Sequence, residues 1–121
     1  MPVVLVVEDD PSVRKLLETV LEEDGYEVIL AQDGLEGLAK VAMRRPDLLV
    51  LDVMMPDVGG LRVLDQMEEE GIGIPVVVIT GKEEALPALR ERLGAANVFG
   101  KPFDLDVLSA RIAALTGLSG R

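Results

Sequence analysis

Short apolar runs alternate with longer amphipathic stretches along the whole chain. Five runs rich in Val, Ile and Leu have the length of a strand that is buried on both faces, as in a parallel sheet. We expect these strands at residues 3–7, 26–30, 48–51, 76–79 and 98–99. The intervening stretches place apolar residues three or four positions apart, which is typical of helices with one buried face.

Cap and turn residues separate the expected elements. Asp10 is suited to cap a first helix that has Pro11 at its first position and ends at Gly25. The apolar face of this helix is expected to hold Val13, Leu16, Leu17, Val20 and Leu21. Its charged residues, such as Arg14, should face water. Further helices are expected at about residues 33–44, 61–70 and 84–93, and from residue 105 onward.

Five strands that alternate with five helices predict an α/β protein. The expected architecture is a (βα)5 chain with a doubly wound, five-stranded parallel sheet that has helices on both faces. We expect the strand order 2-1-3-4-5, which places a topological switch point between the first and third strands, where ligands of open α/β sheets bind. A length of 121 residues suits a single domain over residues 1–121.

The composition excludes several classes of function. The chain has neither histidine nor cysteine, which excludes a histidine nucleophile, a thiolate metal site and a disulfide. Its net charge of −10 makes direct binding to nucleic acid unfavourable, because phosphate contacts supply most of that affinity. No apolar run approaches the ~20 residues of a membrane-spanning helix, so we expect a soluble, cytoplasmic protein.

Polar side chains follow four of the five expected strands. Glu8-Asp9 follows the first strand, Asp52 the third, Thr80 the fourth and Lys101 the fifth. Because the carboxyl ends of parallel strands lie along one edge of a sheet, we expect these groups to converge. Three carboxylates, one hydroxyl and one ammonium suit Mg²⁺-assisted phosphoryl transfer to an aspartate. Oxygen ligands without nitrogen or sulfur favour Mg²⁺ or Mn²⁺ over zinc.

Each of these residues also has a purely structural interpretation. Residues 8–10 could form only a polar turn with a helix cap, but Asp10 alone provides the cap, and the two remaining carboxylates repel each other unless a cation is present. Thr80 could be an ordinary strand residue, and Lys101 could be a surface charge. The proline after Lys101 favours instead an ammonium that reaches toward Asp52. The sequence leaves open whether the bond to this proline is cis.

Four segments carry these residues and span nearly the whole chain in one order. They are VVEDD (6–10), LLVLDVMMPDVGG (48–60), VVVITGK (76–82) and GAANVFGKPF (94–103). Together they resemble the receiver domain of two-component response regulators. The resemblance implies a CheY-like fold, which has the flavodoxin-like strand order given above. It also implies a phosphoprotein of phosphorelay signal transduction that catalyses its own phosphorylation and dephosphorylation without turning over a separate substrate.

The resemblance further implies a role for each polar residue at this edge of the sheet, which we call the acidic edge and which carries Glu8, Asp9, Asp52, Thr80 and Lys101. Asp52 would be the phosphoacceptor and would take the phosphoryl group from a phosphohistidine of a sensor histidine kinase or a histidine phosphotransfer protein. Asp9 would bind Mg²⁺ directly and Glu8 through water, and Asp52 and the backbone carbonyl of Met54 would complete the protein ligands. Lys101 would neutralise charge on the phosphoryl oxygens.

Signalling in this family depends on a switch. Thr80 would move toward the new phosphoryl group and bias the face built from the fourth helix, the fifth strand and the fifth helix between two states. That face would control a downstream protein target, a missing output domain or a phosphorylation-dependent homodimer. The family usually has an aromatic residue three positions before the lysine, where this chain has Val98. The neighbouring Phe99 should point to the opposite face of the sheet.

Three alternatives remain after the motifs are weighed. Because Val98 replaces the aromatic residue, the fold could be a docking scaffold with weak or no phosphorylation-dependent switching. A flavodoxin-like flavin binder fits less well, because residues 8–10 would repel the phosphate of the flavin. A phosphatase with an aspartate nucleophile usually has a second acid two residues later, where this chain has Met54. We expect no output domain in these 121 residues, which fits either a stand-alone receiver or one domain of a longer regulator.

Overall fold

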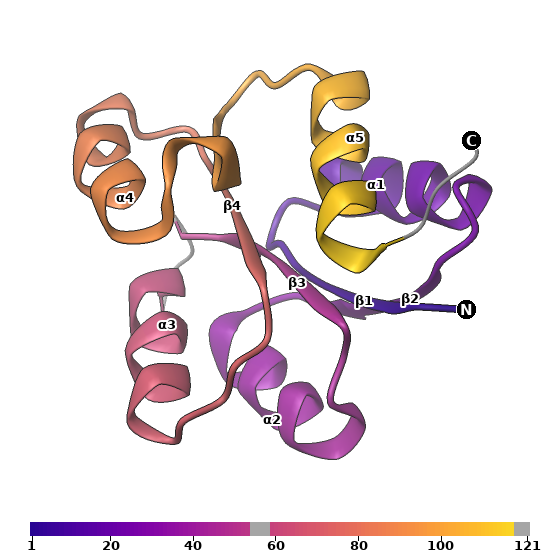
Figure 1. Ribbon diagram of the computed structural model, residues 1–121, viewed down its shortest axis with the longest axis horizontal. Helices are drawn as coiled ribbons and strands as arrows, with labels where there is room; N and C mark the ends of the chain where they lie inside the picture. Colours follow the sequence, from indigo (N-terminus) through magenta and orange to yellow (C-terminus); the bar gives the residue numbers. More distant parts are fainter. Residues whose placement is uncertain (54–58, 118–121) are drawn as a thin grey trace.

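The computed structural model describes residues 1–53 and 59–117 and shows a parallel sheet between two layers of helices (Figure 1). The strands are β1 (Val3–Val7), β2 (Glu27–Ala31), β3 (Leu48–Asp52), β4 (Val76–Thr80) and β5 (Val98–Gly100). The α-helices are α1 (Pro11–Glu23), α2 (Gly34–Arg44), α3 (Gly60–Glu69), α4 (Leu86–Leu93) and α5 (Leu105–Thr116). Two short 3₁₀ turns, η1 (Glu83–Ala85) and η2 (Ala95–Asn97), flank α4. None of the helices within these ranges has the length and apolar character needed to cross a membrane.

The sheet has the order β2-β1-β3-β4-β5, with all neighbouring strands parallel. The expected α/β architecture and strand order are therefore confirmed. The chain passes from one side of β1 to the other, so the switch point lies between β1 and β3. The acidic residues expected to form a site lie at the ends of these two strands, Glu8-Asp9 after β1 and Asp52 as the last residue of β3.

The apolar runs are continuous because each strand contributes side chains to two cores. Leu5 and Val7 of β1 join one core, which α2, α3 and α4 cover, while Val4 and Val6 join the other, which α1 and α5 cover. Figure 1 shows α1 and α5 together on one side of the sheet and α2 and α3 on the other. All residues of β3 are buried, as expected for a central strand with helices on both faces.

The side chains of β5 alternate between the two faces of the sheet, as expected for a strand. Val98 is buried in the core beneath α2, α3 and α4, whereas Phe99 packs against the core beneath α1 and α5. The expectation that Phe99 points away from Val98 is confirmed, because successive side chains of a strand alternate between its faces. Phe99 therefore does not stand in for an aromatic residue at position 98.

The first helix confirms its predicted cap but not its whole apolar face. Asp10 has extended backbone angles, and its carboxylate accepts hydrogen bonds from the backbone of Ser12 and Val13. Leu17 is buried, but Leu16 is 44% exposed. Its expected burial is wrong because the helix presents a narrower apolar stripe to the sheet than the five apolar positions suggest.

Several element boundaries differ by one or two residues from the sequence prediction. Tyr26 precedes β2 rather than starting it, and its hydroxyl shares a 3.0 Å hydrogen bond with Thr116 at the end of α5. The fourth helix was expected from about residue 84, but η1 occupies its start and α4 begins at Leu86. Pro87 is in the first turn of α4, where its missing N–H costs no helical hydrogen bond.

Candidate functional site

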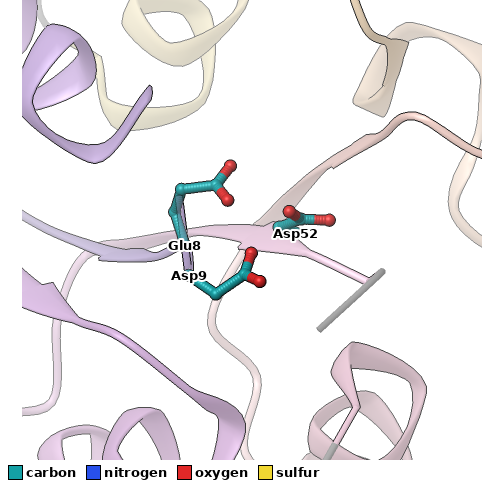
Figure 2. Close-up of side chains that lie close together, drawn as sticks. All are labelled: Glu8, Asp9 and Asp52. Atoms are coloured by element: carbon teal, nitrogen blue, oxygen red, sulfur yellow. The ribbon is translucent and has the colours of Figure 1, made fainter. Parts of the chain in front are cut away.

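Three carboxylates meet where β1 and β3 end. Glu8 and Asp9 come from the turn after β1, and Asp52 comes from the neighbouring strand end (Figure 2). One carboxylate oxygen from each residue lies within 4.8 Å of the corresponding oxygens of the other two. The convergence predicted from the strand ends is therefore confirmed for the acidic residues.

Lys101 brings a positive charge into this cluster. Its Nζ atom lies 3.0 Å from Oδ2 of Asp52 and 2.8 Å from Oε1 of Glu8. The contact with Asp52 confirms the expected direction of the ammonium, but the bond to Glu8 was not predicted. The bond between Lys101 and Pro102 is cis, which answers the question that the sequence left open.

Glu8 and Asp52 are buried although both are acidic. The exposed fraction is 0% for Glu8 and 2% for Asp52, so water solvates neither carboxylate well. Hydrogen bonds replace part of this solvation. Glu8 accepts one from Lys101 and another, of 3.1 Å, from the backbone N–H of Asp10. The single ammonium of Lys101 is shared between two buried carboxylates.

The ionisation of this cluster reflects its burial and its excess of acidic groups. The pKa of Glu8 is raised to about 7, because burial and the neighbouring Asp52 raise it by more than the bonds from Lys101 and Asp10 lower it. Burial acts to lower the pKa of Lys101, but its bonds to Glu8 and Asp52 outweigh this and hold the pKa above its usual value. The Lys101 ammonium therefore stays charged, and a bound cation would favour the ionised form of Glu8.

Backbone packing fixes the position of Asp52. Gly60, the first residue of α3, lies so close to the end of β3 that an ideal Cβ atom there would be 2.4 Å from Cα of Val53 and 2.7 Å from the carbonyl oxygen of Asp52. Only a residue without a side chain permits this approach. The sequence pattern at Gly59-Gly60 marks a helix start, but it gives no sign of which backbone the helix touches.

Arg14 contributes to the site in a way that the sequence analysis missed. Instead of facing water as expected, its Nη1 atom donates to the carbonyl oxygen of Glu8 at 2.8 Å and to that of Asp9 at 3.4 Å. Both carbonyl groups lie after Val7, the last residue of β1, and Arg14 of α1 supplies a hydrogen-bond donor to them. An arginine one helical turn after a cap residue is a weak signal, because most such residues are solvated.

Thr80 ends β4 and is 1% exposed. Its Oγ1 accepts a hydrogen bond from the backbone N–H of Lys82 at 3.1 Å, and its carbonyl oxygen accepts one from the N–H of Lys101 at 2.7 Å. The β4 and β5 ends are thus tied to each other beside the acidic cluster. The remaining residue of the expected ligand set, Met54, lies outside the described residues.

The set of donors fits a hard divalent cation. Carboxylate oxygens are the side-chain ligands that the cluster offers, and Mg²⁺ prefers one or two carboxylates together with water and phosphate oxygens. When Glu8 is ionised, it and Asp52 carry two negative charges against the one positive charge of Lys101, which a divalent cation would offset. The residues present therefore fit Mg²⁺ better than a metal that requires nitrogen or sulfur ligands.

Comparison with known proteins places this site in a family. The family model for the response regulator receiver domain matches residues 4–113. The response regulator MprA of Mycobacterium sp. (strain KMS) is 45% identical over 95% of this chain and 51% of its own length. The alkaline phosphatase synthesis transcriptional regulatory protein PhoP of Bacillus subtilis (strain 168) is 40% identical over 93% of this chain and 47% of its own length.

Solved structures agree with the sequence matches. The response regulator protein TrrA of Thermotoga maritima, solved in complex with Mg²⁺-BeF, has a TM-score of 0.85 and 31% identity, covering 95% of this chain and 99% of that one. The receiver domain of Francisella response regulator 1452 has a TM-score of 0.88 and 29% identity, covering 97% of this chain and 98% of that one. The chain spans about half the length of the curated relatives. With the fold, the acidic edge and the family model in agreement, this chain belongs to the response regulator receiver domains.

Proposed function

We propose that Asp52 accepts a phosphoryl group from a phosphohistidine of a partner protein. The observation that carries this proposal is the convergence of Glu8, Asp9 and Asp52 within 4.8 Å, with the Lys101 ammonium 3.0 Å from Asp52. A carboxylate oxygen of Asp52 would attack phosphorus, forming an O–P bond while the N–P bond to the imidazole breaks. The imidazole leaves with the electron pair of that bond and takes up a proton.

Glu8, Asp9 and Asp52 are the residues that would hold Mg²⁺ in this reaction. The ion, when bound, would neutralise negative charge on the phosphoryl oxygens and on the carboxylates that approach them. Met54, whose backbone carbonyl the family resemblance adds to this set, remains part of the proposal. The protein contributes mainly position and charge, since phosphoryl transfer requires little other chemistry from an enzyme.

Lys101 and Thr80 would act on the phosphoryl group after it arrives. The Lys101 ammonium is already 3.0 Å from Asp52, so it can pair with a phosphoryl oxygen with little movement. Thr80 would exchange its bond to the Lys82 N–H for a bond to a phosphoryl oxygen, which would release the loop before α4. The α4-β5-α5 face would then favour a second arrangement and change the affinity for a partner.

The partners that we propose follow from the family. The donor would be a sensor histidine kinase or a histidine phosphotransfer protein, because this chain has no histidine of its own. The acceptor of the signal would be a downstream protein, an output domain or a second copy of the chain. The cytoplasm is the compartment that we expect.

A phosphorylation assay tests the acceptor assignment. The protein is incubated with Mg²⁺ and phosphoramidate, whose P–N bond resembles that of phosphohistidine, and the mass of the intact protein is measured. We expect one added phosphoryl group on the wild type and on the control Asp106→Asn, a substitution at an exposed aspartate of α5. Asp52→Asn should add none. Addition to Asp52→Asn at the wild-type rate would refute the proposal.

A second candidate function, a docking scaffold with little switching, is favoured by Val98. This residue is buried where the family usually has a movable aromatic side chain. Amide NMR spectra with Mg²⁺ and beryllium fluoride, a phosphoryl mimic, distinguish the two functions. Shifts that spread from Asp52 to Thr80, Val98 and α4 would support a switch, whereas shifts confined to the three carboxylate residues of the acidic edge would support the scaffold.

A further inference from the structure

The guanidinium of Arg14 binds the backbone of the turn formed by Glu8 and Asp9 rather than a carboxylate. Its Nη1 atom lies 2.8 Å from the Glu8 carbonyl oxygen and 3.4 Å from the Asp9 carbonyl oxygen. The closer distance is that of a strong hydrogen bond, and the longer one is a weaker second contact. Arg14 therefore places a positive charge beside the acidic cluster without occupying any of its carboxylate oxygens.

The direction of the Asp9 carboxylate depends on this turn. Glu8 is fixed by its bonds from Lys101 and from the Asp10 N–H, and Asp10 is fixed by its role as the helix cap. Within the described part of the chain, by contrast, no hydrogen bond reaches the carboxylate of Asp9, which is exposed. The backbone that carries Asp9 is what sets its position, and Arg14 holds this backbone at the carbonyl groups of Glu8 and Asp9, beside the bond from the Asp10 N–H to Glu8.

The stability of α1 does not account for a cation at this position. The amino end of a helix carries a partial positive charge, so it favours acids and disfavours cations. In α1 the first turn has no acid and the last turn has no base, and Arg14 directly follows the first turn. A charge placed against the helix dipole but bonded to the end of β1 suggests a role at the acidic edge.

We propose that Arg14 is a positioning residue for the divalent cation, because it holds the Glu8-Asp9 backbone where the Asp9 carboxylate can join Asp52. This inference rests on the proposed function, in which Asp9 and Asp52 bind Mg²⁺. Its two physical effects have opposite signs. The charge of Arg14 repels the cation, whereas its hydrogen bonds preorganise the ligands, and the proposal states that preorganisation dominates.

An Mg²⁺ titration followed by amide NMR separates these effects. We expect Arg14→Ala to weaken Mg²⁺ binding by about 10-fold, within the range seen when a partner of a metal ligand is removed. The matched control is Lys15→Ala, which removes a cation from the next, exposed position of α1, where Lys15 pairs only with Glu18 within the described residues. That variant should bind Mg²⁺ as well as the wild type, or more tightly. Arg14→Lys, which keeps the charge and can donate to one carbonyl, should restore part of the affinity.

Each outcome has a defined meaning. Mg²⁺ binding by Arg14→Ala that equals or exceeds that of the wild type would overturn the positioning role, since only the charge of Arg14 would then matter. An absence of Mg²⁺ binding by the wild type would overturn the proposed function itself. Thermal unfolding without Mg²⁺ is measured for each variant, and if Arg14→Ala is unfolded, the comparison between Arg14→Lys and the wild type decides. Equal affinity and unchanged Asp9 amide shifts in that pair would then overturn the role.

Discussion

The hydroxyl of Thr80 accepts a hydrogen bond from the backbone N–H of Lys82, with 3.1 Å between the two atoms. Lys82 is the cap residue of η1, and η1 leads directly into α4. The side chain that we expect to respond to a phosphoryl group is therefore also the one that holds the start of the α4 segment. A movement of Thr80 toward Asp52 would leave the Lys82 N–H without this partner.

Replacing Thr80 by valine should separate phosphorylation from the response. Valine has nearly the shape of threonine, so Asp52 should still accept a phosphoryl group. The response of η1 should be lost, because it depends on the hydroxyl of Thr80. We expect beryllium fluoride to shift the amides of Asp9 and Asp52 in Thr80→Val, but not those of α4. The lost bond to Lys82 should lower the free energy of unfolding by about 0.5–1.5 kcal/mol, measured by urea denaturation.

Thr80→Ser is the matched control, because it keeps the hydroxyl. This variant should show the wild-type spread of amide shifts. If the α4 amides of Thr80→Val moved as far as those of the wild type, Thr80 would not be the link between the acidic edge and α4.

Leu86 occupies a position suited to transmit such a movement to β5. Gly100 pairs with Thr80 in the sheet, and an ideal Cβ atom on Gly100 would lie 3.4 Å from Cδ1 of Leu86. Leu86, the first residue of α4, therefore packs over the backbone of Gly100, next to Thr80. We expect Leu86→Ala to stop the shifts at Val98 that beryllium fluoride causes in the wild type, and to cost about 1–2 kcal/mol of stability, less than a fully buried leucine.

Leu93→Ala provides the comparison for Leu86→Ala. Leu93 is also partly buried against the same core, but it lies at the far end of α4. Its truncation should destabilise the protein by a similar amount and leave the shifts at Val98 in place. Equal losses of the Val98 response in the two variants would mean that general loosening of α4, rather than the Leu86 contact, is responsible.

Much of the fold and part of the site follow from periodicity. Buried parallel strands read as continuous apolar runs, and their carboxyl ends share one edge, so the convergence of Glu8, Asp9 and Asp52 could be predicted. The opposite directions of Val98 and Phe99 were predictable for the same reason, since the side-chain period of a strand is two.

The side-chain contacts that complete the site could not be predicted in this way. Which acid shares the Lys101 ammonium depends on how deeply the end of β1 is buried, and Glu8 and Asp9 look alike in the sequence. The bond from Arg14 goes to backbone carbonyls, which every residue has, so no side-chain pattern marks it. The close approach of Gly60 is likewise a property of helix placement.

Gly60→Ala should be far more damaging than an ordinary substitution at a helix start. The new methyl group would overlap backbone atoms of Val53 and Asp52, which cannot rotate away as a side chain can. Moving α3 or the end of β3 to relieve this contact should cost about 1–3 kcal/mol or more, and should displace the Asp52 carboxylate. Both effects are measurable, the first by urea denaturation and the second by the rate of phosphorylation.

Gly73→Ala is the control for added methyl volume. An ideal Cβ atom at Gly73 meets no other atom within 4 Å, so this variant should unfold at the wild-type urea concentration and be phosphorylated normally. A Gly60→Ala variant with the same stability and the same phosphorylation rate as Gly73→Ala would show that α3 can shift at little cost.

The metal-free protein should lose stability as the pH rises toward neutrality because of Glu8. Burial raises the pKa of this carboxyl from 4.5 to about 7 in the folded state. Between these values the folded state keeps a proton that the unfolded state has lost, so the free energy of unfolding falls with rising pH. The contribution of protonated Glu8 is fully present below about pH 4.5 and is lost as the pH passes through about 7, a change of about 1–3 kcal/mol.

Glu8→Gln isolates this contribution, because glutamine keeps a hydrogen-bonding side chain but does not titrate. Urea denaturation in the presence of a chelator at pH 5, 6, 7 and 8 should give a wild-type stability that falls relative to Glu8→Gln across this series. Saturating Mg²⁺ should remove that fall for the wild type, since a bound cation favours the ionised carboxylate. A constant difference between the two proteins at all four pH values would show that Glu8 is already ionised in the metal-free fold at pH 5.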